Sequence, residues 1–123
     1  PIGMALIATD GRLLKVNWAL LQMTGYSETA LLTGSLQSIT HPDDLDTERA
    51  YLDEVLAGNR RTYHLESRYH HADGRLIWVS LHVSLVRDAS STPLYLIAHL
   101  EDITERKLRV VGARGNSTAK VCV

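Results

Sequence analysis

The feature that most constrains the fold of this chain is the alternation of apolar and other side chains over residues 75–87. Successive side chains of a β-strand point to opposite faces, so the pattern predicts a strand with one buried face. Residues 62–71 and 94–102 form similar runs, separated from the first by turn sequences at Asp73-Gly74 and residues 88–93. The inward side chains of the middle and last runs are expected to be Ile77, Val79, Leu81, Val83 and Leu85, then Leu94, Leu96, Ala98 and Leu100.

Three helices are predicted upstream of these strands. Asn17 is a suitable N-cap for a short helix over residues 18–24, which stops at Gly25. Residues 28–32 form a second short helix. A longer helix over residues 42–56 begins with proline and two carboxylates, which the helix dipole favours there. Its apolar stripe is expected to consist of Leu45, Leu52, Val55 and Leu56.

The chain begins with two short apolar runs, residues 4–9 and 13–17, around an Asp10-Gly11 turn that predicts a β-hairpin. The order is therefore two strands, three helices and three strands. This order indicates an α+β domain, in which a five-stranded antiparallel sheet carries its helices on one face.

The register of the hairpin around Asp73-Gly74 follows from the cost of burying charge. A two-residue turn would place Val79 opposite Arg68 and drive an unpaired charge into the core. A three-residue loop over residues 72–74, with Gly74 in the left-handed conformation, pairs Val79 with Ser67 instead. We therefore predict the three-residue loop. It also pairs Ile77 with Tyr69, Leu81 with Leu65 and, on the outer face, Trp78 with Arg68.

Composition limits the partners of a chain of this size. The 123 residues suffice for one ordinary domain, and a net charge of -1 without a basic run makes nucleic acid an unexpected partner. No apolar run is long enough to cross a membrane, and the start lacks the features of a signal peptide. The single cysteine, Cys122, cannot form an internal disulfide. A cytoplasmic location is expected.

Several motifs together resemble the PAS family of sensory domains, in its S-box-like variety with a PAC-type segment. The resemblance extends over about residues 3–107. The residues that carry it are Asn17, Gly25-Tyr26-Ser27, His41-Pro42-Asp43-Asp44, Glu66, Arg68, Asp73-Gly74, Trp78-Val79 and the terminal run Asp102-Ile103-Thr104-Glu105-Arg106-Lys107.

The resemblance implies a sensory domain at residues 1–107 of a bacterial-type signalling protein, with residues 108–123 as a linker or tail. It implies that a signal leaves through Asp102, Ile103 and Thr104 toward a C-terminal effector, either a histidine kinase or a diguanylate cyclase. The excerpt itself is expected to be non-catalytic, because it contains neither a glycine-rich phosphate loop nor a nucleophile elbow. Two alternatives are a receptor domain with a defined small-molecule or metal ligand, and a purely structural dimerisation spacer.

The family fold also implies a pocket between the sheet and the helices. We expect it to be apolar, and either empty or occupied by a small uncharged ligand. Its expected lining residues are Leu65, Ser67, Tyr69, Val79, Leu81, Val83, Ala98 and Leu100 from the strands, and Leu20, Met23, Leu52, Val55 and Leu56 from the helices.

No cofactor is predicted, although haem and flavin stay open. The helix over residues 43–56 offers haem no histidine, and the region between the second strand and that helix lacks the cysteine of light-sensing relatives. His64, His82 and His99 fall on one outer face, where they could share a metal ion. We prefer the interpretation that they are solvated or lie in an interface, and predict no metal site.

The outer face of the sheet is predicted to form a homodimer interface, because it combines aromatic and apolar side chains on a surface otherwise exposed to water. Its members are Trp78, His82, Tyr95, Ile97 and His99. Two interpretations of Asp102 are open: it pairs with a basic residue such as Arg68, or it only terminates the last strand.

Overall fold

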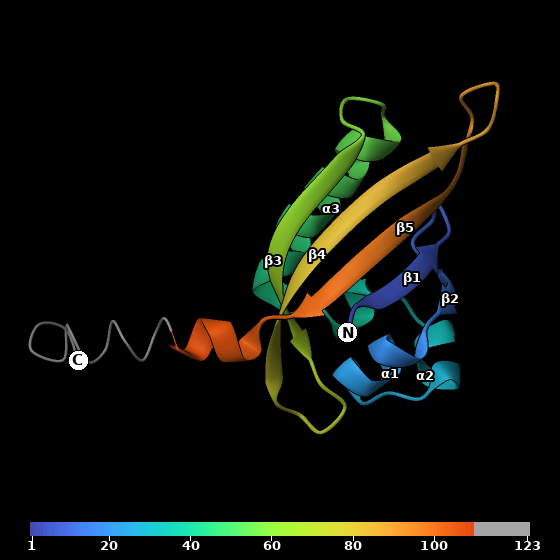
Figure 1. Ribbon diagram of the computed structural model, residues 1–123. Helices are drawn as coiled ribbons and strands as arrows, with labels where there is room; N and C mark the ends of the chain where they lie inside the picture. Colours follow the sequence, from blue (N-terminus) through green and yellow to red (C-terminus); the bar gives the residue numbers. More distant parts are fainter. Residues whose placement is uncertain (110–123) are drawn as a thin grey trace, which may run out of the picture.

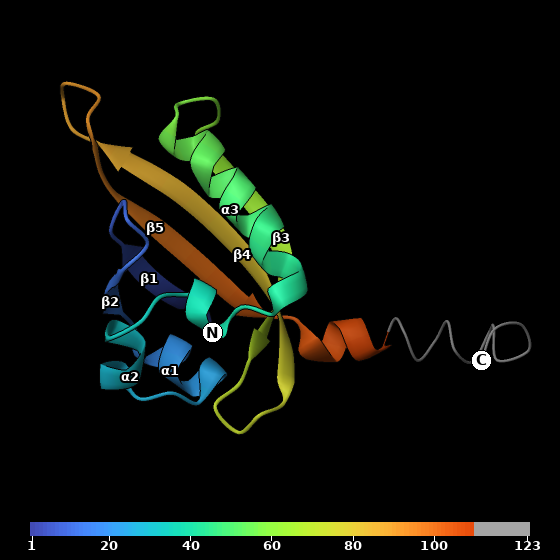
Figure 2. The same cartoon turned by 180° about the vertical axis from the view of Figure 1, so that it is seen from behind.

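The computed structural model describes residues 1–109, and they form one sheet with helices packed on one side (Figures 1 and 2). The elements in chain order are β1 (Gly3–Ile7), β2 (Leu13–Val16), α1 (Trp18–Thr24), α2 (Glu28–Leu32), the 3-10 helix η1 (Gln37–Ile39), α3 (Pro42–Leu56), β3 (Thr62–His70), β4 (Leu76–Arg87) and β5 (Pro93–Asp102). Residues 104–109 form a further helix. The five strands form one antiparallel sheet, as the sequence predicts, and their order in it is β2-β1-β5-β4-β3.

The helices divide the inner face of the sheet between them. Short helices α1 and α2 pack on β1 and β2, while α3 lies across β3 and β4 (Figure 2). Asn17 connects α1 to β1. Its side-chain oxygen accepts the N–H groups of Leu20 in α1 and Met4 in β1, and its side-chain amide donates to the Ile2 carbonyl. This N-cap thus also fixes the distance between α1 and β1.

The predicted register of the β3–β4 hairpin is confirmed. Ser67 pairs with Val79, and Trp78 pairs with Arg68. The loop between the strands has Gly74 in the left-handed region, at φ 98°. The Asp73 carboxylate accepts the N–H of Arg75 at 3.0 Å and its guanidinium Nε at 3.0 Å, so the loop carries its own ion pair.

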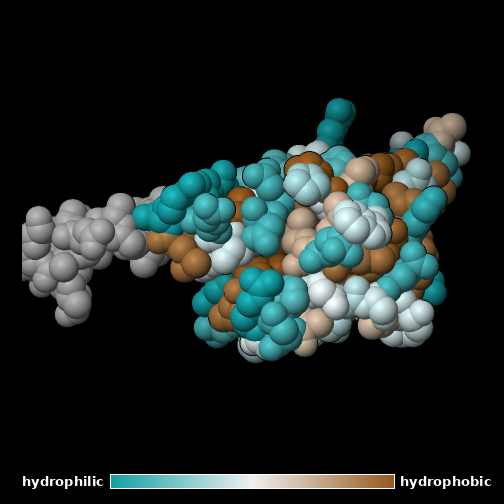
Figure 3. Space-filling view, turned by 60° about the horizontal axis from the view of Figure 1, so that its bottom comes forward, coloured by the Kyte–Doolittle hydropathy of each residue, from teal (hydrophilic) through white to brown (hydrophobic). Residues whose placement is uncertain are grey.

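The core lies between the inner face of the sheet and the helices. Leu81, Leu96 and Leu100 at its centre are fully buried. Leu94, which the alternation places inward, is exposed instead, because a register shift between Val86 and Arg87 displaces the start of β5. Hydrophobic side chains also reach the surface between hydrophilic ones (Figure 3).

Residues 1–109 contain no helix long and apolar enough to cross a membrane. The helix over residues 104–109 extends across the predicted boundary between residues 107 and 108. The predicted tail from residue 110 onward, with Cys122, lies outside the described residues.

Candidate functional site

The chain at and just after the end of β5 is tied to Trp78, near the start of the neighbouring strand β4. The Ile103 N–H donates to the Trp78 carbonyl at 2.9 Å. The Thr104 hydroxyl accepts the Trp78 N–H at 2.9 Å and lies 3.4 Å from the Trp78 carbonyl. The Asp102 carboxylate accepts the N–H of Thr104, two residues further on, at 2.9 Å. We call Trp78, Asp102, Ile103 and Thr104 the exit junction.

The helix over residues 104–109, which we call the exit helix, is held to the outer face of the sheet by charge. Lys107 forms an ion pair with Glu66 of β3, and the Arg106 guanidinium lies 3.7 Å from the same carboxylate. The hydrogen bond from Lys107 lowers the pKa of Glu66 below its ordinary value. The Lys107 ammonium also lies 4.7 Å from the centre of the Trp78 ring, within the range of a cation–π contact.

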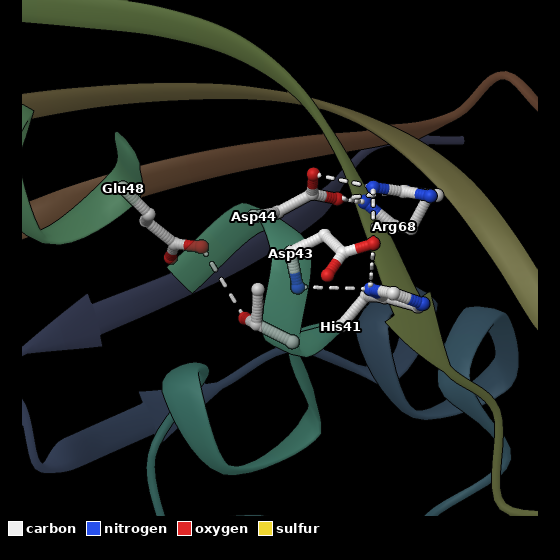
Figure 4. Close-up of polar contacts among 6 residues, drawn as sticks. His41, Asp43, Asp44, Glu48 and Arg68 are labelled. Carbon is white, nitrogen blue, oxygen red and sulfur yellow. Dashed lines mark hydrogen bonds and ion pairs between the residues drawn. The ribbon is translucent and has the colours of Figure 1, made fainter. Parts of the chain in front are cut away.

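A second polar cluster joins the start of α3 to β3 (Figure 4). The Arg68 guanidinium binds Asp44 through two contacts, of 2.9 and 3.0 Å, and Asp44 also accepts the Arg68 backbone N–H at 2.8 Å. The Arg68 guanidinium holds the pKa of Asp44 below its ordinary value. Of the two interpretations of Asp102, pairing with a basic residue such as Arg68 is wrong, because Asp102 forms no ion pair among residues 1–109. Asp102 is the last residue of β5, as the second interpretation has it.

Glu48 is the residue that the sequence interpretation missed. It lies one turn after Asp44 in α3, and its side chain is 1% exposed. Its carboxylate lies 3.2 Å from the hydroxyl of the buried Thr40 (Figure 4). Burial raises the pKa of Glu48 to about 7. A signal was present, because Glu48 stands at helical spacing between Leu45 and Leu52 and so belongs to the inward stripe.

Most of the predicted pocket residues converge on the interior beneath the helices. Those that are buried are Leu20, Val55, Ser67, Tyr69, Val79, Leu81, Val83, Ala98 and Leu100; those that are half-buried are Met23, Leu52, Leu56 and Leu65. The interior is less apolar than predicted, because Thr40 and Glu48 are buried in it as well. Within residues 1–109, the Ser67 and Tyr69 hydroxyls are buried without a hydrogen-bond partner. Such groups are costly to leave unpaired.

The predicted dimer residues lie on the outer face, with Trp78, Tyr95 and Ile97 half-buried and His82 and His99 exposed. Ile97 lines an apolar groove of about 340 Å³ that also involves Met4 and Leu6 of β1. The Trp78 ring is less available than predicted, because the Arg68 guanidinium lies 5.4 Å from its centre, in addition to Lys107.

The histidines of the outer face lie side by side as predicted. His82 pairs with both His64 and His99 across the strands, and the rings of His64 and His82 stack at 4.1 Å. His64 also contacts the Ser80 hydroxyl at 2.8 Å. Among residues 1–109 no group of three or more potential ligands has the geometry of a metal site.

Comparison with known proteins agrees with this arrangement. The family model described as PAS fold matches residues 13–100. A probable diguanylate cyclase of Escherichia coli, DgcE, is 43% identical over 106 residues, which are 86% of this chain and 10% of that protein. The sensor histidine kinase TmoS of Ectopseudomonas mendocina is 30% identical over 105 residues, 85% of this chain and 11% of that protein. The chain thus spans about a tenth of the length of these curated relatives.

Solved structures share the fold. The N-terminal domain of a diguanylate cyclase with PAS/PAC sensor from Marinobacter aquaeolei superimposes with a TM-score of 0.75 at 19% identity. The match covers 87% of this chain and 99% of that one. At this identity the likeness shows a shared fold.

Proposed function

Because this chain belongs to the PAS family of sensory domains, we propose that it is a non-catalytic sensory or relay module of a larger signalling protein. A change in its interior or in a bound partner would leave through the exit junction to a C-terminal effector. The two curated relatives favour a diguanylate cyclase or a histidine kinase as that effector.

The observation that carries this proposal is the double attachment of the segment after β5. Its backbone and the Thr104 hydroxyl bind the backbone of Trp78, and Lys107 binds Glu66 on the next strand. A shift of β3 or β4 therefore displaces the start of the exit helix directly. No loop intervenes between the strand and this attachment, so the displacement is not absorbed by flexible chain.

The substitution Thr104→Val in the protein that carries this sequence tests the proposal. Valine keeps the shape of threonine but loses the hydroxyl that accepts the Trp78 N–H. We expect effector output to change severalfold, or to lose its response to the input. The free energy of unfolding of the domain should fall by only about 1 kcal/mol. The measurement is the effector's enzymatic rate in both variants.

Thr104→Ser is the matched control, because serine retains the hydroxyl and lacks only the methyl group. It should keep output close to that of the wild type. If Thr104→Val and Thr104→Ser both give wild-type output under every condition, the exit junction does not transmit the signal.

We also propose that the chain self-associates through the outer face of the sheet. The apolar groove at Ile97, Met4 and Leu6 supports this, and Ile97 replaces Trp78 as the expected anchor. Sedimentation of Ile97→Asp should show loss of the dimer, because a buried unpaired carboxylate opposes association. Leu94→Asp serves as control, since Leu94 is exposed at the start of the same strand and outside the predicted interface. A wild-type monomer at micromolar concentration contradicts the proposal.

A receptor domain with a bound ligand is the second candidate function. The partnerless hydroxyls of Ser67 and Tyr69 favour it, because a polar ligand between α3 and the sheet could satisfy both. Native mass spectrometry of the purified chain separates the two functions. A retained small molecule supports the receptor, and a bare polypeptide mass favours the relay module.

A further inference from the structure

Glu48 is an acidic side chain placed where an ion is poorly tolerated. It is 1% exposed and lies in the middle of α3, facing the sheet. Among residues 1–109 no basic side chain forms an ion pair or hydrogen bond with it. An ionised carboxylate without a cation or several donors is strongly disfavoured in such an environment.

The hydrogen bonds of Thr40 indicate which protonation state of Glu48 fits this environment. The Thr40 hydroxyl lies 2.7 Å from the Leu36 carbonyl, which can only accept, so this short contact uses the single hydroxyl hydrogen. The same oxygen lies 3.2 Å from Glu48 Oε2. The hydroxyl hydrogen can therefore only be shared with Glu48, so Thr40 offers an ionised carboxylate one weak donor. This is too little to stabilise a buried ion, and the neutral acid is the form that fits.

Most of the groups that face Glu48 favour its neutral form. From α3 itself Asp44 adds negative charge, and Arg68 keeps Asp44 ionised. From β3 come the phenols of Tyr63 and Tyr69, whose pKa values are themselves raised by burial, so both stay neutral. Thr40, from the segment before α3, opposes the shift only in part. The pKa of Glu48 therefore rises to about 7.

Loss of this proton would change the packing of α3. An ionised Glu48 seeks hydrogen-bond donors in an interior that offers few. The Tyr69 hydroxyl on the facing strand is buried without a partner at hydrogen-bond distance, and it senses the charge of Glu48. Ionisation would therefore favour a shift of α3 relative to β3 that brings the carboxylate closer to this hydroxyl or to water.

We propose that Glu48 is a proton-binding site through which this domain responds to pH, with α3 packed on the sheet when the carboxyl is neutral and displaced when it is ionised. The proton would be an input of the module, and this part of the inference rests on the proposed function. The displacement would reach the exit junction through β3, which carries both Arg68 and Glu66.

A nuclear magnetic resonance titration of the whole chain tests the site itself. The side-chain carboxyl carbon of Glu48 should titrate with a midpoint near 7, well above the ordinary pKa of 4.5. Backbone amide signals of α3 and β3 should shift with the Glu48 midpoint in the wild type and not in Glu48→Gln. Asp44→Asn should lower the midpoint, because it removes the neighbouring negative charge. A Glu48 midpoint below pH 5, or amide signals indifferent to it, overturns the proposal.

Effector output in the longer protein separates this inference from the proposed function. We expect output to change severalfold between pH 6 and pH 8 in the wild type, and to be flat in Glu48→Gln. If output responds to Thr104→Val but Glu48→Gln behaves as wild type across this range, the proton is not the input and this inference fails. If output ignores Thr104→Val as well, the proposed function fails.

Discussion

Replacing Ile103 with alanine is expected to lower the free energy of unfolding by about 3 kcal/mol, which is a large share of the stability of a small domain. The Ile103 side chain is 2% exposed, so the shorter side chain leaves a cavity beneath the exit junction. The backbone hydrogen bond from Ile103 to Trp78 can persist, because it does not involve the side chain. Urea unfolding followed by circular dichroism measures the effect.

Leu108→Ala is the matched control for this prediction. Leu108 lies five residues further on in the exit helix and is 63% exposed, so its truncation should cost less than about 0.5 kcal/mol. Equal losses in the two variants would mean that Ile103 does not anchor the exit junction in the core. An effect confined to Ile103 shows that the segment after β5 is folded as part of the domain.

The predictions from sequence that the structure confirms rest on local rules. The three-residue hairpin loop follows from keeping Arg68 out of the core, and the structure pairs Ser67 with Val79 accordingly. The cap at Asn17 and the proline start of α3 follow from the few residues that satisfy helix ends. Each rule involves neighbours in sequence or one strand pair, so the amino-acid pattern suffices.

Contacts between distant segments account for what the sequence interpretation missed. Arg68 and Asp44 belong to different elements, and nothing in their local sequence favours this pair over Arg68 with Asp102. The position of Lys107 near Trp78 depends on the direction in which the exit helix leaves the sheet. Leu94 becomes exposed through a register shift that the alternation does not reveal.

The sequence interpretation missed Glu48 for a different reason. Its position on the inward stripe of α3 can be derived from helical spacing, but charged residues are normally assigned to the outside. The burial of Glu48 depends on how closely α3 approaches β3, and the Arg68–Asp44 contacts help to set that distance. The functional hypothesis thus changes from an apolar pocket to an interior that holds an ionisable group.

The stability of the domain is expected to fall by about 3 kcal/mol as the pH rises from about 4.5 to about 7, through Glu48 alone. The unfolded chain releases this proton near the ordinary pKa of 4.5, whereas burial raises the pKa in the folded state to about 7. Between these values the folded state binds more protons, so the contribution is full below 4.5 and lost as the pH passes about 7.

The difference in unfolding free energy between wild type and Glu48→Gln isolates this contribution, because the substitution removes this ionisable group and leaves every other one in place. Glutamine resembles the neutral acid in shape, carries no charge and keeps an oxygen that can accept from Thr40, so the two proteins should be about equally stable at pH 4.5. At pH 8 the glutamine variant should be more stable by about 2–3 kcal/mol. Urea unfolding at intervals of half a pH unit provides the curve, with Glu101→Gln as a control that should follow the wild type. A constant difference between wild type and Glu48→Gln at all pH values would show that the pKa of Glu48 is not raised in the folded protein.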